Sequence, residues 1–194
     1  MARPKEFDRD QALTQAMAVF WGKGYEGTST EDLLRAMGIG RQSMYDTFGD
    51  KRTLYLEALR RYTAESVSTF VQNLNAGGSS LAALERALVA FAWGSPEDMA
   101  KGCMGVNAMC EFGRGDSEIN SLNDSSAAIL AAAIERHVRD GKAKGEFRPD
   151  VGEGQAARFL IAILTGMKVN ARVGATMQSL RDIARLAVTS LKAT

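Results

Sequence analysis

The sequence predicts an all-helical protein, because of its proline distribution, its composition and the spacing of its apolar residues. Only three prolines occur among 194 residues, at positions 4, 96 and 149. The spans between them are rich in Ala, Leu, Met, Glu and Arg, which are strong helix formers. Apolar residues recur three and four positions apart, so they line single faces of helices. We therefore expect a fold of helices packed on helices.

The composition is that of a globular protein in a reducing compartment. Hydrophobic residues make up 45% of the chain and charged residues 24%, which allows a sizeable core. Two cysteines do not form a disulfide scaffold. No apolar run reaches the roughly 18 residues of a membrane span, and the residues after Met1 lack the apolar core of a signal peptide. We expect a cytoplasmic protein without a membrane partner.

Short helices are expected in the first third of the chain. The first should begin after Asp8 and end at Gly22 and Gly24, with its apolar residues on one face. The residues Thr28 and Glu31 have the spacing of a capping box, which predicts the start of a second helix. That helix should end at Gly38, with three apolar residues directed inward: Leu33, Leu34 and Met37.

A third short helix is expected over residues 39–48, followed by a long fourth one. Met44 and Phe48 lie four positions apart and should form the buried side of the third helix. Gly49 breaks it, and Asp50 is a suitable N-cap for a helix that continues to Leu74.

The remaining two thirds should form a second group of helices. Residues 75–80 are the clearest turn in the chain, and Ser80 is the expected cap of the next helix, which should end near residues 94–96. Further helices are expected over residues 99–112, 116–140, 155–172 and 177–192, and residues 141–154 should form a loop. We divide the chain into a domain of residues 1–50, a linking helix over 50–74 and a C-terminal domain of residues 75–194.

Two short helices joined by a glycine-containing turn predict a helix-turn-helix, whose second helix fits the major groove of DNA. Arg41 could donate two hydrogen bonds to guanine, and Gln42 could pair with adenine. Tyr45 and Lys51 could contact phosphates. Residues 1–61 carry ten Lys or Arg and nine Asp or Glu, a balance that argues against a protein that coats DNA regardless of sequence.

The same region carries a family resemblance. It rests on Ala18-Val19-Phe20, on Gly24-Tyr25-Glu26-Gly27-Thr28-Ser29-Thr30-Glu31-Asp32-Leu33-Leu34, and on Gly38-Ile39, Ser43-Met44-Tyr45 and Phe48-Gly49-Asp50-Lys51. This run resembles the N-terminal domain of the TetR family of transcriptional regulators. The resemblance implies a homodimeric repressor that a small-molecule inducer releases from palindromic double-stranded operator DNA.

Residue by residue, the resemblance implies a DNA-binding set. It puts Arg41 and Gln42 on bases, and it puts Thr30, Tyr45 and Lys51 on phosphates. Ser43 belongs to the same set, as does Gly40, where a serine or threonine is common in the family. Asp46 departs from the family pattern, since it would either repel phosphate or accept a hydrogen bond from a cytosine amine. The role of Asp46 stays open.

The C-terminal helices are expected to form a dimer interface and an inducer pocket. Residues 160–164 are apolar on every side, so both the chain itself and a second surface must cover them. The resemblance implies a four-helix dimer interface built from residues 155–172 and 177–192. It also implies an inducer pocket in this domain, for which the sequence offers candidates: Phe91, Met99, Cys103, Met104 and Cys110.

Two other functions remain possible on the sequence alone. Cys103 and Cys110 would lie seven positions apart on one helix, too distant for a disulfide but available for a regulator of the same fold that senses oxidants or electrophiles. An all-helical enzyme is the more remote alternative, because His137 is the only histidine and has no nucleophile nearby in sequence. No Cys or His stands at metal-ligand spacing, so we expect no catalytic residue, metal or cofactor.

Overall fold

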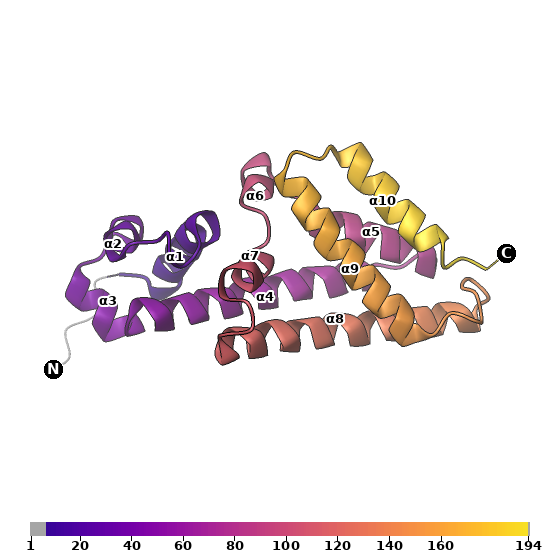
Figure 1. The fold of residues 1–194 in the computed structure, drawn as a ribbon, viewed down its shortest axis with the longest axis horizontal. Helices are drawn as coiled ribbons and strands as arrows, with labels where there is room; N and C mark the ends of the chain where they lie inside the picture. The colour runs from indigo at the N-terminus through magenta and orange to yellow at the C-terminus, as the bar shows by residue number, and fades with distance from the viewer. Residues whose placement is uncertain (1–6, 194) are drawn as a thin grey trace. The chain divides into compact units, whose positions relative to one another are not determined.

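The computed structural model describes residues 7–193, which form ten α-helices and no strand, so the all-helical prediction is confirmed (Figure 1). Residues 1–6, on which the expectation of no signal peptide rests, lie outside the described residues, as does Thr194. The described chain divides into two compact units. Unit 1 contains the residues up to Thr63 together with Met104–Leu122, and unit 2 contains Ala64–Cys103 and the residues from Asn123 onward.

Unit 1 holds the three short helices that the sequence predicts. They are α1 (Arg9–Lys23), α2 (Thr30–Met37) and α3 (Arg41–Phe48). Helix α1 begins at an Asp8 N-cap and ends at Gly24, and α2 ends at Gly38, whose φ of 64° is a left-handed conformation that glycine adopts readily. The first part of α4 (Lys51–Asn75), all of α7 (Met104–Phe112) and the first residues of α8 (Ser117–Ala143) complete this unit.

The capping box of α2 lies one residue later than predicted. Ser29 is the N-cap, its hydroxyl accepts from the Asp32 amide at 3.1 Å, and the Asp32 carboxylate accepts from the Ser29 amide at 3.1 Å. The expected pair of Thr28 and Glu31 is wrong because the buried Thr28 hydroxyl instead donates to the Gly24 carbonyl at 2.6 Å and closes the preceding turn. An ion pair with Lys23 and the bonds from Ser29 hold the pKa of Asp32 well below its usual range.

Apolar side chains of α1 to α4 form the core of unit 1. Met44 and Phe48 are buried, as predicted, and pack the inner side of α3 against the rest of the unit. The Asp50 carboxylate accepts from the Thr53 amide at 2.7 Å, which confirms it as the cap of α4. The core also contains Leu13, Ala16, Phe20, Leu33, Met37, Leu54, Tyr55, Ala58 and Leu59. The buried side of the short helix α3 therefore holds it on this core, and its outer face is exposed to solvent.

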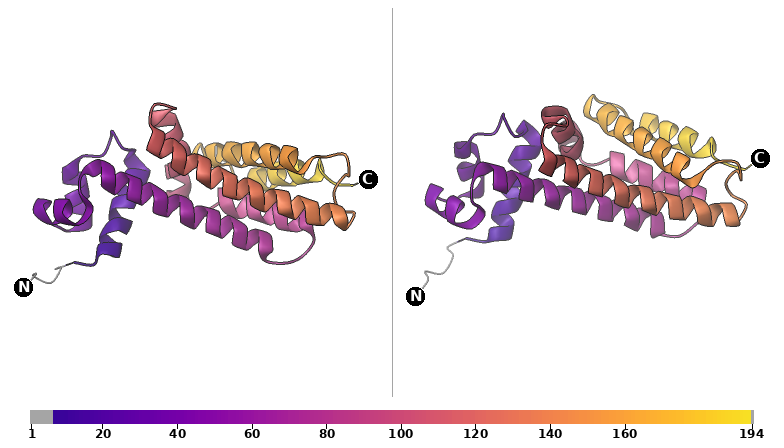
Figure 2. Two further views of the ribbon diagram at one scale, coloured as in Figure 1. Left: turned by 90° about the horizontal axis from the view of Figure 1, so that it is seen from below. Right: turned by 60° about the horizontal axis from the view of Figure 1, so that its bottom comes forward.

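Unit 2 is a helical bundle around one hydrophobic core. It contains the rest of α4 and α8, together with α5 (Ser80–Ala92), α6 (Pro96–Lys101), α9 (Glu153–Arg172) and α10 (Met177–Thr189). In both views of Figure 2, α8 runs alongside the second half of α4, and α10 packs against both α5 and α9. Side chains from five of these helices share one core, among them Phe70, Leu88, Ile134, Leu164 and Leu180.

Three expected boundaries in the second part of the chain are wrong. The cap of α5 is Ser79 and not Ser80, which is buried inside the helix. The single helix expected over 99–112 is two helices, because Gly102 adopts a φ of 73° that ends α6. Helix α8 extends past Gly141 to Ala143, and Gly141 leaves room for the Phe147 ring, from which a Cβ there would lie 2.4 Å away.

Candidate nucleic-acid interface

The outer face of α3 carries the polar side chains that the sequence assigns to DNA. Arg41, Gln42 and Tyr45 are exposed, and Tyr45 keeps 44% of its surface accessible although its ring is large and apolar. Met44 and Phe48 of the same helix are buried. Helix α3 therefore presents an arginine, an amide and a phenol together on one rigid surface.

The two predicted base-contacting side chains have carboxylate partners in the protein itself. The Arg41 guanidinium pairs with Glu31 of α2, and both side chains are more than half exposed. The Gln42 amide donates to the Asp46 carboxylate at 2.8 Å, one turn further along α3. The pairing of Glu31 with Arg41 was not predicted from the sequence, because ten residues separate them and the packing of α2 beside α3 brings their side chains together.

The start of α3 offers backbone amides to an anion. Gly40 is the N-cap and has no side-chain cap, and a Cβ built on it would meet no atom within 4 Å. The first amides of α3 are therefore accessible at the positive end of the helix dipole. Ser43 lies half-buried in the first turn of α3, and Thr30 lies half-buried at the first position of α2.

Lys51 lies at the first position of α4, with its ammonium 4.2 Å from the centre of the Tyr25 ring. Tyr25 in turn contacts the rings of Tyr55 and Phe112, with centroids 5.1 and 5.6 Å away. This ring cluster supports the lysine from beneath and limits the conformations of its side chain. Lys51 thus places a cation on an aromatic ring just after α3.

A carboxylate from α7 fixes the turn that connects α1 to α2. Glu111 accepts hydrogen bonds from the backbone amides of Tyr25 at 3.0 Å and Glu26 at 2.7 Å. Gly24 lies so close that a Cβ there would stand 3.0 Å from this carboxylate. A second contact joins α4 to the start of α8: Arg52 of α4 pairs with Asp116 at 2.7 Å and with Glu118 at 2.9 Å. No local pattern in the sequence could have found these contacts, since they join residues more than 60 positions apart.

The predicted pocket residues do not all belong to one unit. Phe91, Met99 and Cys103 are half-buried in unit 2, whereas Met104 is buried and Cys110 is exposed in unit 1. Lys168, which no sequence pattern indicated, is half-buried in unit 2 with its ammonium 4.7 Å from the centre of the Phe91 ring. Burial lowers the pKa of Lys168, while the nearby Cys103 and Asp98 raise it. The region around Phe91 therefore combines apolar surface with a poorly solvated cation.

The two cysteines do not share a helix. Cys103 lies in the link between α6 and α7, and only Cys110 lies within α7. The expectation of one helix face is wrong because Gly102 ends α6 before the cysteines. The spacing of a continuous helix therefore does not give the distance between Cys103 and Cys110, on which the exclusion of a disulfide rested.

The sequence also raised His137 and possible metal ligands as candidates for other chemistry. His137 is half-buried, its Nε2 lies 3.2 Å from the Ser80 carbonyl, and burial lowers its pKa. Residues 7–193 contain no group of three or more His, Cys, Asp or Glu side chains that could hold a metal ion. Over the same range, no helix has the length and apolar character to cross a membrane.

Helix α9 has an outer face that the other described residues leave uncovered. Leu160 and Leu164 are buried, whereas Phe159 is 40%, Val169 48% and Val173 77% exposed. Gly166 and Ala162 lie between these side chains on the same face, and Leu186 of α10 is 73% exposed. Residues 155–172 and 177–192 thus carry the apolar surface that a partner helix would need.

Comparisons with known proteins agree with this architecture. The sequence matches the family model described as bacterial regulatory proteins, tetR family, over residues 12–58, and that described as tetracyclin repressor-like, C-terminal domain, over residues 79–187. It is 32% identical over 184 residues to the HTH-type transcriptional repressor ComR of Escherichia coli K12, with 94% of this chain and 88% of that protein covered. It is 35% identical over 185 residues to the HTH-type transcriptional regulator YezE of Bacillus subtilis, with 94% and 95% covered.

A solved structure shows the same fold on DNA. It is a cysteine-substituted variant of the TetR family transcriptional regulator CifR, complexed with 26-bp double-strand operator DNA. The TM-score is 0.83 at 28% sequence identity, and the similarity covers 97% of this chain and 99% of that one.

Proposed function

Because this chain belongs to the TetR family of bacterial transcriptional regulators, we propose that it is a homodimeric repressor that a small molecule releases from a palindromic operator. The single observation that carries the proposal is the outer face of α3, where Arg41, Gln42 and Tyr45 are exposed above a buried Met44 and Phe48. An α-helix with its side chains is about 10–12 Å across, which matches the width of the major groove, and α3 has eight residues.

Arg41 and Gln42 contact bases in this proposal, and each must first leave its carboxylate partner. Exposed ion pairs such as that between Arg41 and Glu31 contribute only about 0–1 kcal/mol. A bidentate contact with the correct base contributes about 1–3 kcal/mol of discrimination. The exchange therefore favours operator DNA, and Glu31 and Asp46 keep the two side chains oriented until DNA replaces them.

The phosphate contacts come from the edges of the helix pair. Lys51 lies over the Tyr25 ring, and the amides after Gly40 can donate hydrogen bonds to a phosphate. Thr30, Ser43 and Tyr45 add hydroxyl groups on the same two helices. Contacts of this kind orient the protein on DNA without selecting a sequence.

The dimer in this proposal forms through the outer face of α9 together with α10. The exposed Phe159, Val169 and Val173 along α9 and Leu186 on α10 support this assignment, because neighbouring exposed apolar side chains often mark a protein interface. Two copies are needed because one helix-turn-helix contacts too few base pairs to define a unique operator.

The inducer binds in unit 2 near Phe91, Met99 and Cys103, where Lys168 adds a polar group. Methionine and aromatic surfaces accommodate varied organic molecules. An allosteric coupling of about 1–3 kcal/mol would change operator affinity by about 5- to 150-fold. Binding would favour a spacing of the two α3 helices that no longer fits the operator.

The separate roles of Arg41 and Lys51 give a direct test. We expect Arg41→Ala to cost about 1–3 kcal/mol on operator DNA and to relax the preference at one base pair, because a base contact is lost. Lys51→Ala should weaken binding to operator and random DNA alike. Fluorescence anisotropy on both DNAs measures this, and equal losses on the two DNAs for Arg41→Ala would refute its contact with bases.

A regulator that senses oxidants or electrophiles through a thiol is the second candidate function. It is favoured by the position of Cys110, which is exposed and directly precedes Glu111, the residue that holds the turn before α2. If this function holds, Cys110→Ser should abolish the release of operator DNA by hydrogen peroxide, as measured by electrophoretic mobility shift. Cys103→Ser makes the matched variant, and an unchanged response in both variants would eliminate the candidate.

A further inference from the structure

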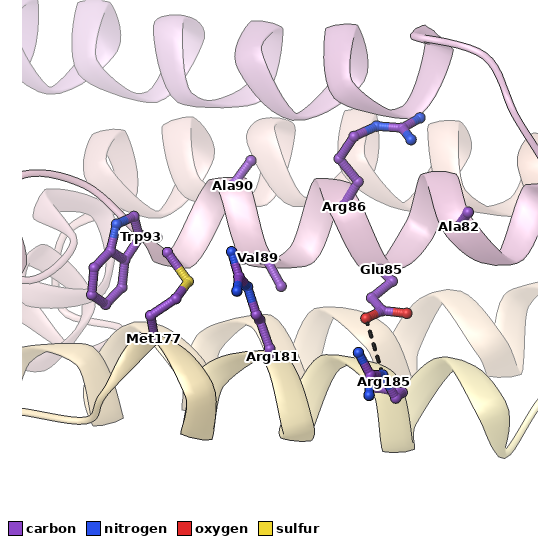
Figure 3. Close-up of a pocket in the computed structure, with 9 residues that line it drawn as sticks. All are labelled: Ala82, Glu85, Arg86, Val89, Ala90, Trp93, Met177, Arg181 and Arg185. Atoms are coloured by element: carbon purple, nitrogen blue, oxygen red, sulfur yellow. Dashed lines mark hydrogen bonds and ion pairs between the residues drawn. The ribbon is translucent and has the colours of Figure 1, made fainter.

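An open groove of about 500 Å³ runs between α5 and α10 in unit 2. Figure 3 shows its walls, which come from Ala82 to Trp93 on α5 and its C-terminal end and from Met177 to Arg185 on α10. The family resemblance and the proposed function assign nothing to this groove. Its two ends differ in chemistry.

One end of the groove is apolar and contains an exposed indole. Trp93 follows the last residue of α5, where the backbone turns into an extended conformation, and 38% of the side chain remains accessible. Met177 at the start of α10 lies across from the indole, and Val89 lies one turn before it on α5 (Figure 3). An aromatic face of this kind binds flat apolar groups.

The other end carries more positive than negative charge. Arg181 lies between this end and the indole, beside Val89 (Figure 3), and within residues 7–193 no hydrogen bond or ion pair engages its guanidinium. Arg185 makes one contact, 3.4 Å from its Nε to Glu85. Arg86 turns away from α10 and donates to the carbonyls of Asn73 and Gly77, as Figure 3 and these contacts show. Arg181 is therefore the guanidinium available to a ligand anion.

The spacing of these groups defines the ligand. Met177 and Arg181 are four residues apart, which is about 6 Å along the helix axis and places both on the same face. A ligand that fills both ends must join a flat apolar body directly to an anionic group. Guanidinium groups bind carboxylates through two parallel hydrogen bonds.

We propose that the groove between α5 and α10 binds a small aromatic carboxylate, with its ring against Trp93 and Met177 and its carboxylate on Arg181. Arg185 adds a second cation at the same end. This binding site is separate from the inducer pocket proposed above, and it does not depend on the DNA-binding function.

Isothermal titration calorimetry with the full chain tests the proposal, using 2-naphthoate and its neutral counterpart 2-naphthalenemethanol as probes. We expect saturable binding of one 2-naphthoate per chain. The affinity for the neutral alcohol should be lower by at least about tenfold, because the alcohol offers the guanidinium no charge. Raising the salt concentration should weaken the binding of 2-naphthoate, since the contact lies near the surface.

Two variants of equal charge locate the site. Arg181→Gln should weaken 2-naphthoate binding about tenfold or more, whereas Arg139→Gln, an exposed change on α8 away from the groove, should leave it unchanged. Circular dichroism checks that both variants are folded. The proposal is overturned by the absence of saturable 2-naphthoate binding, by equal affinity for the two probes, or by equal affinity of Arg181→Gln and the unchanged protein.

Discussion

Replacing Phe159 by glutamate should convert the protein into a monomer and reduce operator affinity by about 100-fold or more, a free-energy loss of about 3 kcal/mol. Phe159 is 40% exposed and lies on the outer face of α9 with Ala162, Val169 and Val173. In a two-fold dimer each substitution occurs twice. Burying two unpaired carboxylates between apolar helices costs several kcal/mol for each ion.

The measurement is size-exclusion chromatography with light scattering, followed by binding to operator DNA obtained by selection. Ile129→Glu is the matched control, because Ile129 is 55% exposed on α8, outside the proposed interface. That variant should remain a dimer and bind the operator normally. A dimeric Phe159→Glu protein with unchanged operator affinity would show that the dimer does not use this face of α9.

Replacing Glu111 by alanine should lower the free energy of unfolding of unit 1 by about 2–3 kcal/mol and weaken operator binding with it. The carboxylate accepts from two backbone amides of the turn before α2, and each hydrogen bond to a charged group contributes about 1.5–3 kcal/mol. Two such bonds would together contribute about 3–6 kcal/mol, and we expect a smaller loss because Glu111 is exposed and water can replace the carboxylate in part. Loosening this turn lets α2 and α3 move relative to α1.

Urea denaturation and DNA binding by anisotropy measure the two effects. Glu111→Gln is the graded control, since it keeps one acceptor oxygen and removes the charge, so its losses should fall between those of the unchanged protein and of Glu111→Ala. If Glu111→Ala unfolds at the same urea concentration and binds the operator equally well, Glu111 does not hold the turn.

Much of the fold could be predicted from local sequence signals. The N-cap at Asp8, the glycines at 24 and 38, and the cap at Asp50 each depend on residues within four positions of one another. The buried side of α3 follows from the spacing of Met44 and Phe48. Helix boundaries of this kind are set by hydrogen bonds within one turn, and the sequence contains all the groups involved.

Where local signals compete, the sequence does not decide between them. Thr28 and Ser29 both can cap α2, and Ser29 does so because the Thr28 hydroxyl is buried on the Gly24 carbonyl. The break at Gly102 depends on close packing as well, since a Cβ there would lie 2.8 Å from the Arg172 side chain. A glycine in a helical pattern does not by itself show which conformation it adopts.

The candidate site was predictable in its residues but not in their partners. Arg41, Gln42 and Tyr45 are exposed on α3, in keeping with the prediction from spacing and family resemblance. Two contacts depend on tertiary packing: the ion pair between Glu31 and Arg41, and the hydrogen bonds that Glu111 accepts from the turn before α2. Asp46, whose role the sequence left open, accepts from Gln42 in the free protein.

The central claim is that α3 recognises a specific DNA sequence as part of a dimer. Selection of the purified protein on a pool of random double-stranded DNA at about 0.15 M salt, followed by sequencing, tests it most directly, because non-specific binding is weak under these conditions. We expect a motif with two-fold symmetry, whose half-sites lie about one helical turn apart and lose one preferred base pair with Arg41→Ala. The absence of an enriched motif, or an asymmetric motif that Arg41→Ala leaves unchanged, would contradict the claim.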